Sequence, residues 1–399
     1  MNTNNINYVF SPYYLKDDTY IKNHSVSKEN KDDVMALYLK AIKDVSTQEV
    51  HGSLSSKVVR YNLGKHKVLI LDDVESKRLD TKEFHLIATY HEETGLCILT
   101  LIFLELGEYE FHMLDQISRN DIQLDIEGEI KEFDEYLAQK FKLVKSGNPN
   151  VLISTSNKPS DEKMLYYLAG ELYESNVMDG EIMSPSLHEA INTNIAQYDT
   201  SEIYCYDSTV LRVDNRGKKD IPSRIKMDVF LTYILELIAF QDAAVSRTSD
   251  KVTLNLAKQD NLTLDMIEDM TVEFGKTMTF WDRYNYKYKT AQNLSDSISA
   301  SFKTEEHLSN YMRNQDFLQQ IVSIKYAKNA HKETKILNFI AIFLFFVQMF
   351  PIVYNILHSI VNKNYISMNE IYLMISSSSL LFLLTLVIIR LITIKRKNI

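Results

Sequence analysis

Two long apolar runs near the end of the chain constrain its fold more than any other feature. The first, Ile336–Leu357, contains 22 residues without a charge, and the second, Ile371–Ile389, contains 19. As helices that rise about 1.5 Å per residue, both are long enough to cross the roughly 30 Å hydrocarbon core of a bilayer. We therefore predict a transmembrane hairpin over residues 336–394, with helices at 336–357 and 371–392 and a short outer loop. A buried helical hairpin in a soluble core is the alternative.

Basic residues lie at the outer ends of both predicted spans, whereas the loop between the spans contains one lysine and one glutamate. The flanking positions are Lys325, Lys328, Lys332 and Lys335, then Arg390, Lys395, Arg396 and Lys397. Because Lys and Arg are retained on the cytoplasmic side, we expect a protein of the cell (inner) membrane with both termini in the cytosol. Residues 395–399 would form a basic cytosolic tail.

The rest of the chain is acidic. Of the formal net charge of −9, residues 336–399 contribute +4, which leaves −13 for residues 1–335. Binding to a nucleic-acid polymer requires a basic surface, so we expect no such partner. With only two cysteines, Cys97 and Cys205, the chain is not a disulfide scaffold.

Polar side chains in the first predicted span are costly to expose to lipid. Gln348 and Asn355 are seven residues apart and therefore share a helix face. The same face contains Ala341, Phe345, Ile352 and Ser359. In a ring of identical helices this face would line a pore, with polar amide rings and apolar constrictions, and Pro351 could act as a hinge. Alternatively, the amides only hydrogen-bond to neighbouring helices and hold a bundle together.

The central part of the chain has few residues that interrupt helices. No proline occurs for 128 residues between Pro222 and Pro351, and the last glycine is Gly275. We therefore predict a helical region and stalk over residues 221–335. The predicted helices run from 221 to about 260, from about 261 to 294, and from 304 through 335 into the first span. A polar interval at 295–306 predicts a turn, after which Thr304 caps the last helix.

The first 220 residues differ from this helical region. Segments rich in Val, Ile, Leu, Phe and Tyr, such as 84–91 and 96–105, indicate strands, with a hairpin at Glu93–Gly95 and a turn at Asn62–Lys65. Helices are predicted at about 129–143 and 162–177. Strands with interspersed helices predict an α+β cytosolic sensing domain over residues 1–220.

The search for catalytic chemistry is negative. The sequence contains no glycine-rich phosphate loop, dinucleotide fingerprint, nucleophile elbow or zinc-binding HExxH motif, so we do not expect an enzyme. His85, His91 and His112 are interpreted as core or surface residues rather than metal ligands. An acidic helix face could hold Mg²⁺ or another divalent cation, although solvated surface is the simpler interpretation. This face consists of Asp265, Glu268, Asp269 and Glu273.

The order of these parts resembles that of the CorA-type metal-ion channel superfamily. The shared features are an amino-terminal domain with strands and helices, a helical stalk, two terminal membrane helices, a short outer loop and a basic tail. Ser367-Met368-Asn369 in the loop is similar to the Gly-Met-Asn signature of that superfamily. The resemblance implies a homo-oligomer that conducts ions. Divergent CorA-like proteins also occur as membrane effectors of prokaryotic antiviral defence, which implies a small nucleotide ligand on the cytosolic domain.

These observations lead to one leading hypothesis and two alternatives. We expect a homo-oligomeric ion channel in a lipid bilayer, gated by a cytosolic ligand such as a nucleotide and able to disrupt membrane integrity in antiviral defence. The first alternative is a CorA-like transporter of Mg²⁺. The second is a membrane-anchored adaptor whose helices serve only as an anchor.

Overall fold

The computed structural model divides the chain into two compact units, Met1–Leu318 and Gln319–Ile399, which are described separately. It describes residues 5–26, 34–48, 57–71, 78–106, 123–126, 129–169, 185–217, 220–257, 264–282, 286–362, 367–369, 372–373, 375–376 and 379.

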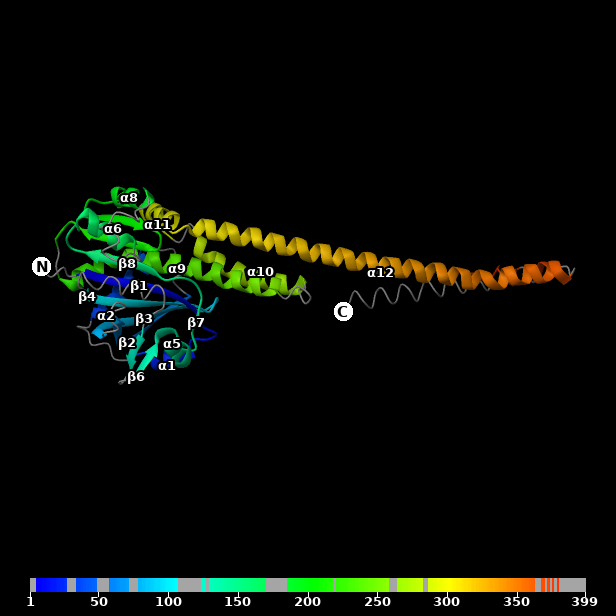
Figure 1. Ribbon diagram of the computed structural model, residues 1–399, viewed down its shortest axis with the longest axis horizontal. Helices are drawn as coiled ribbons and strands as arrows, with labels where there is room; N and C mark the ends of the chain where they lie inside the picture. Colours follow the sequence, from blue (N-terminus) through cyan, green and yellow to red (C-terminus); the bar gives the residue numbers. More distant parts are fainter. Residues whose placement is uncertain are drawn as a thin grey trace. The chain divides into compact units, whose positions relative to one another are not determined.

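A mixed ten-stranded sheet forms the centre of the first unit (Figure 1). Its strands are β1 (Asn5–Tyr14), β2 (Val58–Leu71), β3 (Arg78–His91), β4 (Leu96–Leu106), β5 (Gln123–Ile126), β6 (Glu129–Glu132), β7 (Val144–Lys145), β8 (Asn150–Thr155), β9 (Ser201–Tyr206) and β10 (Thr209–Asp214). The order is β6-β5-β2-β3-β4-β1-β8-β10-β9, and β7 pairs with β1. Among these pairings, β8 and β10 run parallel and the others antiparallel. The α+β expectation is confirmed.

Strand β3 shows why the sheet is buried on both faces. Leu86 and Ala88 contribute to one core, whereas Ile87 between them contributes to the other. Successive side chains of a strand point to opposite faces, so a continuous apolar run supplies two cores at once.

Helices cover both faces of the sheet. One face packs against α1 (Thr19–His24), α5 (Phe133–Phe141), α6 (Asp161–Ala169) and α8 (Pro185–Asn192). The other packs against α2 (Val34–Gln48), α9 (Ile221–Ala257), the 3₁₀ helix η3 (Met278–Trp281) and α11 (Lys289–Ser301). Helix α9 therefore contributes to the core of the first unit, together with the sheet.

Several sequence expectations need correction. The turn expected at Asn62–Lys65 is a β-bulge inside β2, because Gly64 with φ of 89° lets the strand shift register and continue. Residues 129–132 form β6 rather than the start of a helix. Of the helix expected at 162–177, the described part is helical as α6 (Asp161–Ala169), and residues 170–177 lie outside the described residues.

The helical region is also divided differently from the expectation. The long helix expected from about 261 is replaced by α10 (Leu264–Thr277), η3 and α11. The polar residues 295–301, expected to form a turn, belong to α11. Helix α12 (Thr304–Asn362) begins at the expected position, with Glu305 and Glu306 in its first turn, and it continues through Pro351. Thr304 is the first residue of the helix rather than its cap, and its Oγ1 has no hydrogen-bond partner.

A seam of polar side chains holds α9 against the sheet. Asp228, Thr232 and Glu236 are spaced by four residues and therefore lie on one face of the helix. Arg212 of β10 donates to Asp228 at 2.6 Å, and Arg60 of β2 donates to Glu236 at 2.6 Å.

Further hydrogen bonds satisfy the same carboxylates. Ser154 of β8 and Tyr8 of β1 donate to Asp228 at 2.8 and 3.1 Å, and Thr89 of β3 donates to Glu236 at 3.0 Å. Burial raises the pKa of the Asp228 carboxyl, and the Arg212 guanidinium opposes that shift. Buried charges are tolerated when they are paired and hydrogen-bonded in this way.

We expect Asp228→Asn to lower the free energy of unfolding by about 3–5 kcal/mol, because it leaves the buried Arg212 guanidinium without its counter-ion. Trp281 is the only tryptophan and lies in the first unit, so its fluorescence during urea unfolding of the full chain measures this effect. The control Glu83→Gln removes the exposed 3.7 Å pair with Lys67 and should cost less than about 1 kcal/mol. Equal losses in both variants would contradict the role given to the seam.

Gly95 in the hairpin between β3 and β4 provides a second test. Its φ is 69°, and an added Cβ would lie 2.6 Å from the carbonyl oxygen of Leu15. Gly95→Ala should therefore destabilise the first unit by about 2 kcal/mol or more. The control Gly275→Ala in α10 has open space around it and should stabilise by about 0.5–1 kcal/mol. The same unfolding assay would contradict this account if both alanines were neutral.

Candidate functional site

The residues predicted to line a pore all lie on α12, in the second unit. Ala341 and Phe345 are exposed, whereas Ile352, Asn355 and Ser359 are half-buried within the single chain. The side chain of Gln348 lies outside the described residues. Because α12 is helical throughout, the 3.6-residue period places these six positions on one helix face, as the sequence predicted.

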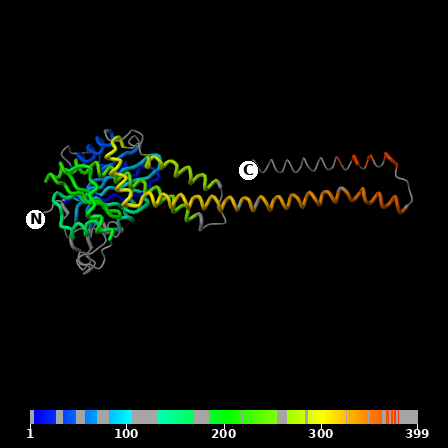
Figure 2. The backbone as a smooth tube through the Cα atoms, turned by 90° about the horizontal axis from the view of Figure 1, so that it is seen from above, coloured from blue at the N-terminus to red at the C-terminus, as the bar shows by residue number. Residues whose placement is uncertain are grey.

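Pro351 lies inside α12, and the helix runs on both sides of it (Figure 2). The hinge role therefore stays a prediction. Ser367, Met368 and Asn369 of the predicted outer loop are exposed, and Met368 and Asn369 are helical. Most of the second predicted span, 371–392, lies outside the described residues.

Two helices of the described chain are long and apolar enough to cross a membrane. The apolar part of α9 is mostly buried in the core of the first unit, whereas the most apolar stretch of α12 has no buried residue. Large apolar side chains are exposed at many positions of that stretch. They include Phe339, Phe343, Phe346, Val347, Phe350 and Leu357. An exposed apolar surface of this extent marks a site of contact with lipid or with another protein.

The acidic face predicted to hold a divalent cation lies on α10. Asp265, Glu268 and Asp269 are exposed there. Glu273 forms ion pairs with Arg247 at 2.5 Å and with Lys251, both on α9. Among the described residues, no group of three or more His, Cys, Asp or Glu side chains is placed to hold a metal ion. Glu273 instead links α10 to α9.

The histidines of β3 are core residues. His85 and His91 are buried, and the His91 ring packs edge-on against Phe280 with ring centroids 5.0 Å apart. Burial lowers the pKa of His91 to about 4, so its imidazole is neutral at physiological pH. His112 lies outside the described residues.

An amphipathic cavity of about 560 Å³ lies between α9, α11, β9 and β10. Its lining combines arginine, tyrosine and apolar side chains, among them Arg212, Arg216, Tyr198, Tyr288, Phe230 and Leu294. Tyr198 and Tyr288 are exposed, and the Tyr198 hydroxyl donates to Thr290 at 3.5 Å. Arg212 forms a buried ion pair with Asp228. Arg216 is more exposed, and its Nε lies 3.2 Å from Asp214 Oδ1. Aromatic rings and a guanidinium are the groups that stack on bases and bind phosphates.

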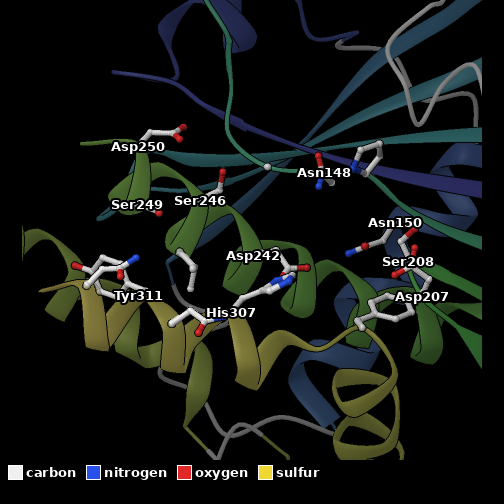
Figure 3. Close-up of a pocket in the computed structure, with 16 residues that line it drawn as sticks. Asn148, Asn150, Asp207, Ser208, Asp242, Ser246, Ser249, Asp250, His307 and Tyr311 are labelled. Carbon is white, nitrogen blue, oxygen red and sulfur yellow. The ribbon is translucent and has the colours of Figure 1, made fainter. Parts of the chain in front are cut away.

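A polar cavity of similar volume, about 560 Å³, lies within the first unit beside the start of α12 (Figure 3). Side chains from α9, β8, the β9–β10 turn and the first turns of α12 line it. Figure 3 shows Asp242 of α9 and His307 of α12 facing one another. Their Oδ1 and Nδ1 atoms are 3.9 Å apart.

Burial and neighbouring charges shift the pKa of each residue of this pair in opposite directions. Burial raises the pKa of the Asp242 carboxyl, and the nearby donors of His307, Asn150 and Thr304 partly lower it. The same carboxylate raises the pKa of His307 above its usual value. Asp242 Oδ1 and Asn150 Nδ2 are nevertheless buried atoms without a hydrogen-bond partner.

No protein-family model, curated protein or solved structure matches this chain. The likeness to the CorA-type superfamily therefore depends on the order of the parts and on Ser367-Met368-Asn369.

Sequence reasoning missed both cavities. The polar cavity combines Asn150, Asp207, Asp242 and His307, which span more than 150 positions of the sequence. These residues occur in no shared motif, and only the packing of α9 and α12 beside the β9–β10 turn brings them together. The pattern of single Asp, Asn and Ser residues gives no signal of its own.

The Asp242–His307 pair predicts a pH dependence. Because the folded-state pKa of His307 is raised, its protonation stabilises the first unit below the unfolded pKa of about 6.5, and this stabilisation is lost as the pH rises through the folded value. We expect Asp242→Asn to move the pKa of His307 down toward 6.5, measured from its imidazole proton shifts by NMR. Asp44→Asn, at an exposed site of α2, is the control. An unchanged His307 titration in Asp242→Asn would refute the coupling.

Proposed function

We propose that this chain forms a homo-oligomeric membrane channel, gated by a small cytosolic ligand, whose pore is lined by α12. The observation that carries this proposal is the exposed apolar stretch of α12. Residues 336–357 have the length and composition of a transmembrane helix. Large apolar side chains along this stretch are exposed.

The polar side chains of α12 favour an oligomer over a protein in which α12 only anchors the chain to the membrane. Asn355 and Ser359 follow the same face as Phe345 and Ile352. Polar side chains at membrane depth are stabilised when they face other helices or a hydrated path. One or two helices cannot enclose such a path, so a ring of several copies is required.

A ligand-controlled channel also needs a binding site outside the membrane. The amphipathic cavity supports a nucleotide as one such ligand, because Tyr198 and Tyr288 could stack on a base and Arg216 could contact a phosphate. A channel opened by a nucleotide would disrupt membrane integrity, as an effector of antiviral defence does.

The two alternatives make different predictions. A CorA-like transporter would restore growth of a magnesium-uptake-deficient strain at low Mg²⁺. A membrane-anchored adaptor would give no ion flux with any ligand. A protein that is monomeric in detergent and in lipid would exclude the channel.

We expect Phe345→Ala to produce a constitutive ion leak, because it widens an apolar constriction that keeps the closed pore dry. Potassium efflux from liposomes containing the full chain measures this leak. Phe350→Ala is the matched control, since position 350 lies on the opposite face of α12 and its side chain is exposed. Equal efflux from both variants would place Phe345 outside the pore.

The amide positions provide the converse test. When Gln348→Leu or Asn355→Leu is combined with Phe345→Ala, the leak should disappear while the oligomer still assembles. The reason is that a ring of apolar side chains raises the free-energy barrier to ions. Native mass spectrometry checks that the oligomer persists. If the leak is not reduced in these double variants, the amide side chains do not line the conduction path.

A further inference from the structure

The polar cavity beside the start of α12 has a lining suited to a ligand different from a nucleotide. Its polar lining comprises three aspartates, four asparagines, three serines, His307 and Tyr311, and no lysine or arginine. Carboxylates repel phosphates and other anions, so this lining favours a neutral or cationic molecule.

Two buried groups of the cavity point to what this molecule must carry. Asp242 Oδ1 can accept a hydrogen bond, and Asn150 Nδ2 can donate one, but neither atom has a partner within hydrogen-bond distance. The His307 Nδ1 atom lies 3.9 Å from Asp242 Oδ1, which is beyond that distance. The Asn150 side chain belongs to a residue that is only 3% exposed, and it lines the cavity. A buried polar atom without a partner destabilises the protein, so a ligand that supplies both partners binds more tightly than one that supplies neither.

The lining of the cavity suits an organic cation better than a metal ion. Among the residues that the structure describes, no three His, Cys, Asp or Glu side chains are grouped to hold a metal. An ammonium needs fewer ligands, because one carboxylate and a few neutral oxygens satisfy its three donors. Asp242 together with the serine and asparagine side chains provides that set.

We propose that the polar cavity binds a small polyhydroxylated amine, an amino sugar or an amino alcohol. Its ammonium lies against Asp242, and its hydroxyl groups accept from Asn150 and exchange hydrogen bonds with the remaining asparagines and serines. A cation at this position also offsets the burial that raises the pKa of Asp242. The inference goes beyond the proposed function, because binding requires neither a membrane nor a pore.

The site is built from three parts of the first unit. Asp242 comes from α9, Asn150 from the first position of β8, and His307 from the first turn of α12 (Figure 3). A bound amine therefore joins α9 and β8 to the start of α12.

Ligand-observed NMR on the full chain tests the proposal, with glucosamine and serinol as amine probes and glucose and glycerol as their amine-free counterparts. We expect both amines to bind at least tenfold more tightly than their counterparts. Binding of only one amine would assign the site to amino sugars or to amino alcohols. Equal affinity of glucose and glucosamine, together with equal affinity of serinol and glycerol, or no binding of either amine at millimolar concentration, would overturn the proposal.

Two variants separate the roles within the cavity. Asp242→Asn should abolish the preference for amines, whereas Asn150→Ala should weaken all probes that bind while keeping the preference. Asp44→Asn on α2 is the matched control and should change nothing. Trp281 fluorescence checks that each variant is folded, and the wild-type comparison of amine and amine-free probes decides the question if a variant does not fold. A preference for amines that persists in folded Asp242→Asn would refute the site.

Discussion

The attachment of α9 to the central sheet is the interaction on which the rest of the first unit depends. Apolar side chains of this helix pack into the core against the sheet. Asp228 and Glu236 add a more specific constraint, because each meets one arginine, on β10 and β2 respectively. A displacement by one turn would separate both pairs and leave four charged groups buried without partners. The seam thus fixes the position of α9, and with it both cavities that α9 lines.

Helices α9 and α12 are similar in apolar composition but differ in burial. Both are long and apolar enough to cross a membrane, yet the apolar part of α9 is mostly buried and that of α12 is exposed. In α9, Asp228 and Glu236 interrupt the apolar sequence and pair with arginines of the sheet. In α12, the stretch 336–357 contains no charge that could meet a partner in a soluble core. This difference supports assigning only α12 to the bilayer.

The two cavities of the first unit differ in chemistry although they have similar volumes. The amphipathic cavity combines Arg216 with exposed tyrosines, which suits an anion with an aromatic part. The polar cavity combines carboxylates with neutral amides and hydroxyls, which suits an ammonium. Both have α9 in their walls, and the polar cavity also contains His307 of α12. Two ligands of opposite charge could therefore contact the same helix at different points along its length.

The sequence by itself determined the α+β class, the hairpin at Gly95, the start of α12 and the periodic face that contains Phe345 and Asn355. These features depend on local patterns, namely alternation, turn residues, acidic residues in the first turn of a helix and helical period. Only the tertiary structure decided that Asn62–Lys65 is a bulge, that residues 295–301 are helical and that Asp228 pairs with Arg212. It also decided that Asn150, Asp242 and His307 share one cavity. Each of these depends on contacts between distant parts of the chain, whose free energy outweighs local preference and leaves no periodic trace in the sequence.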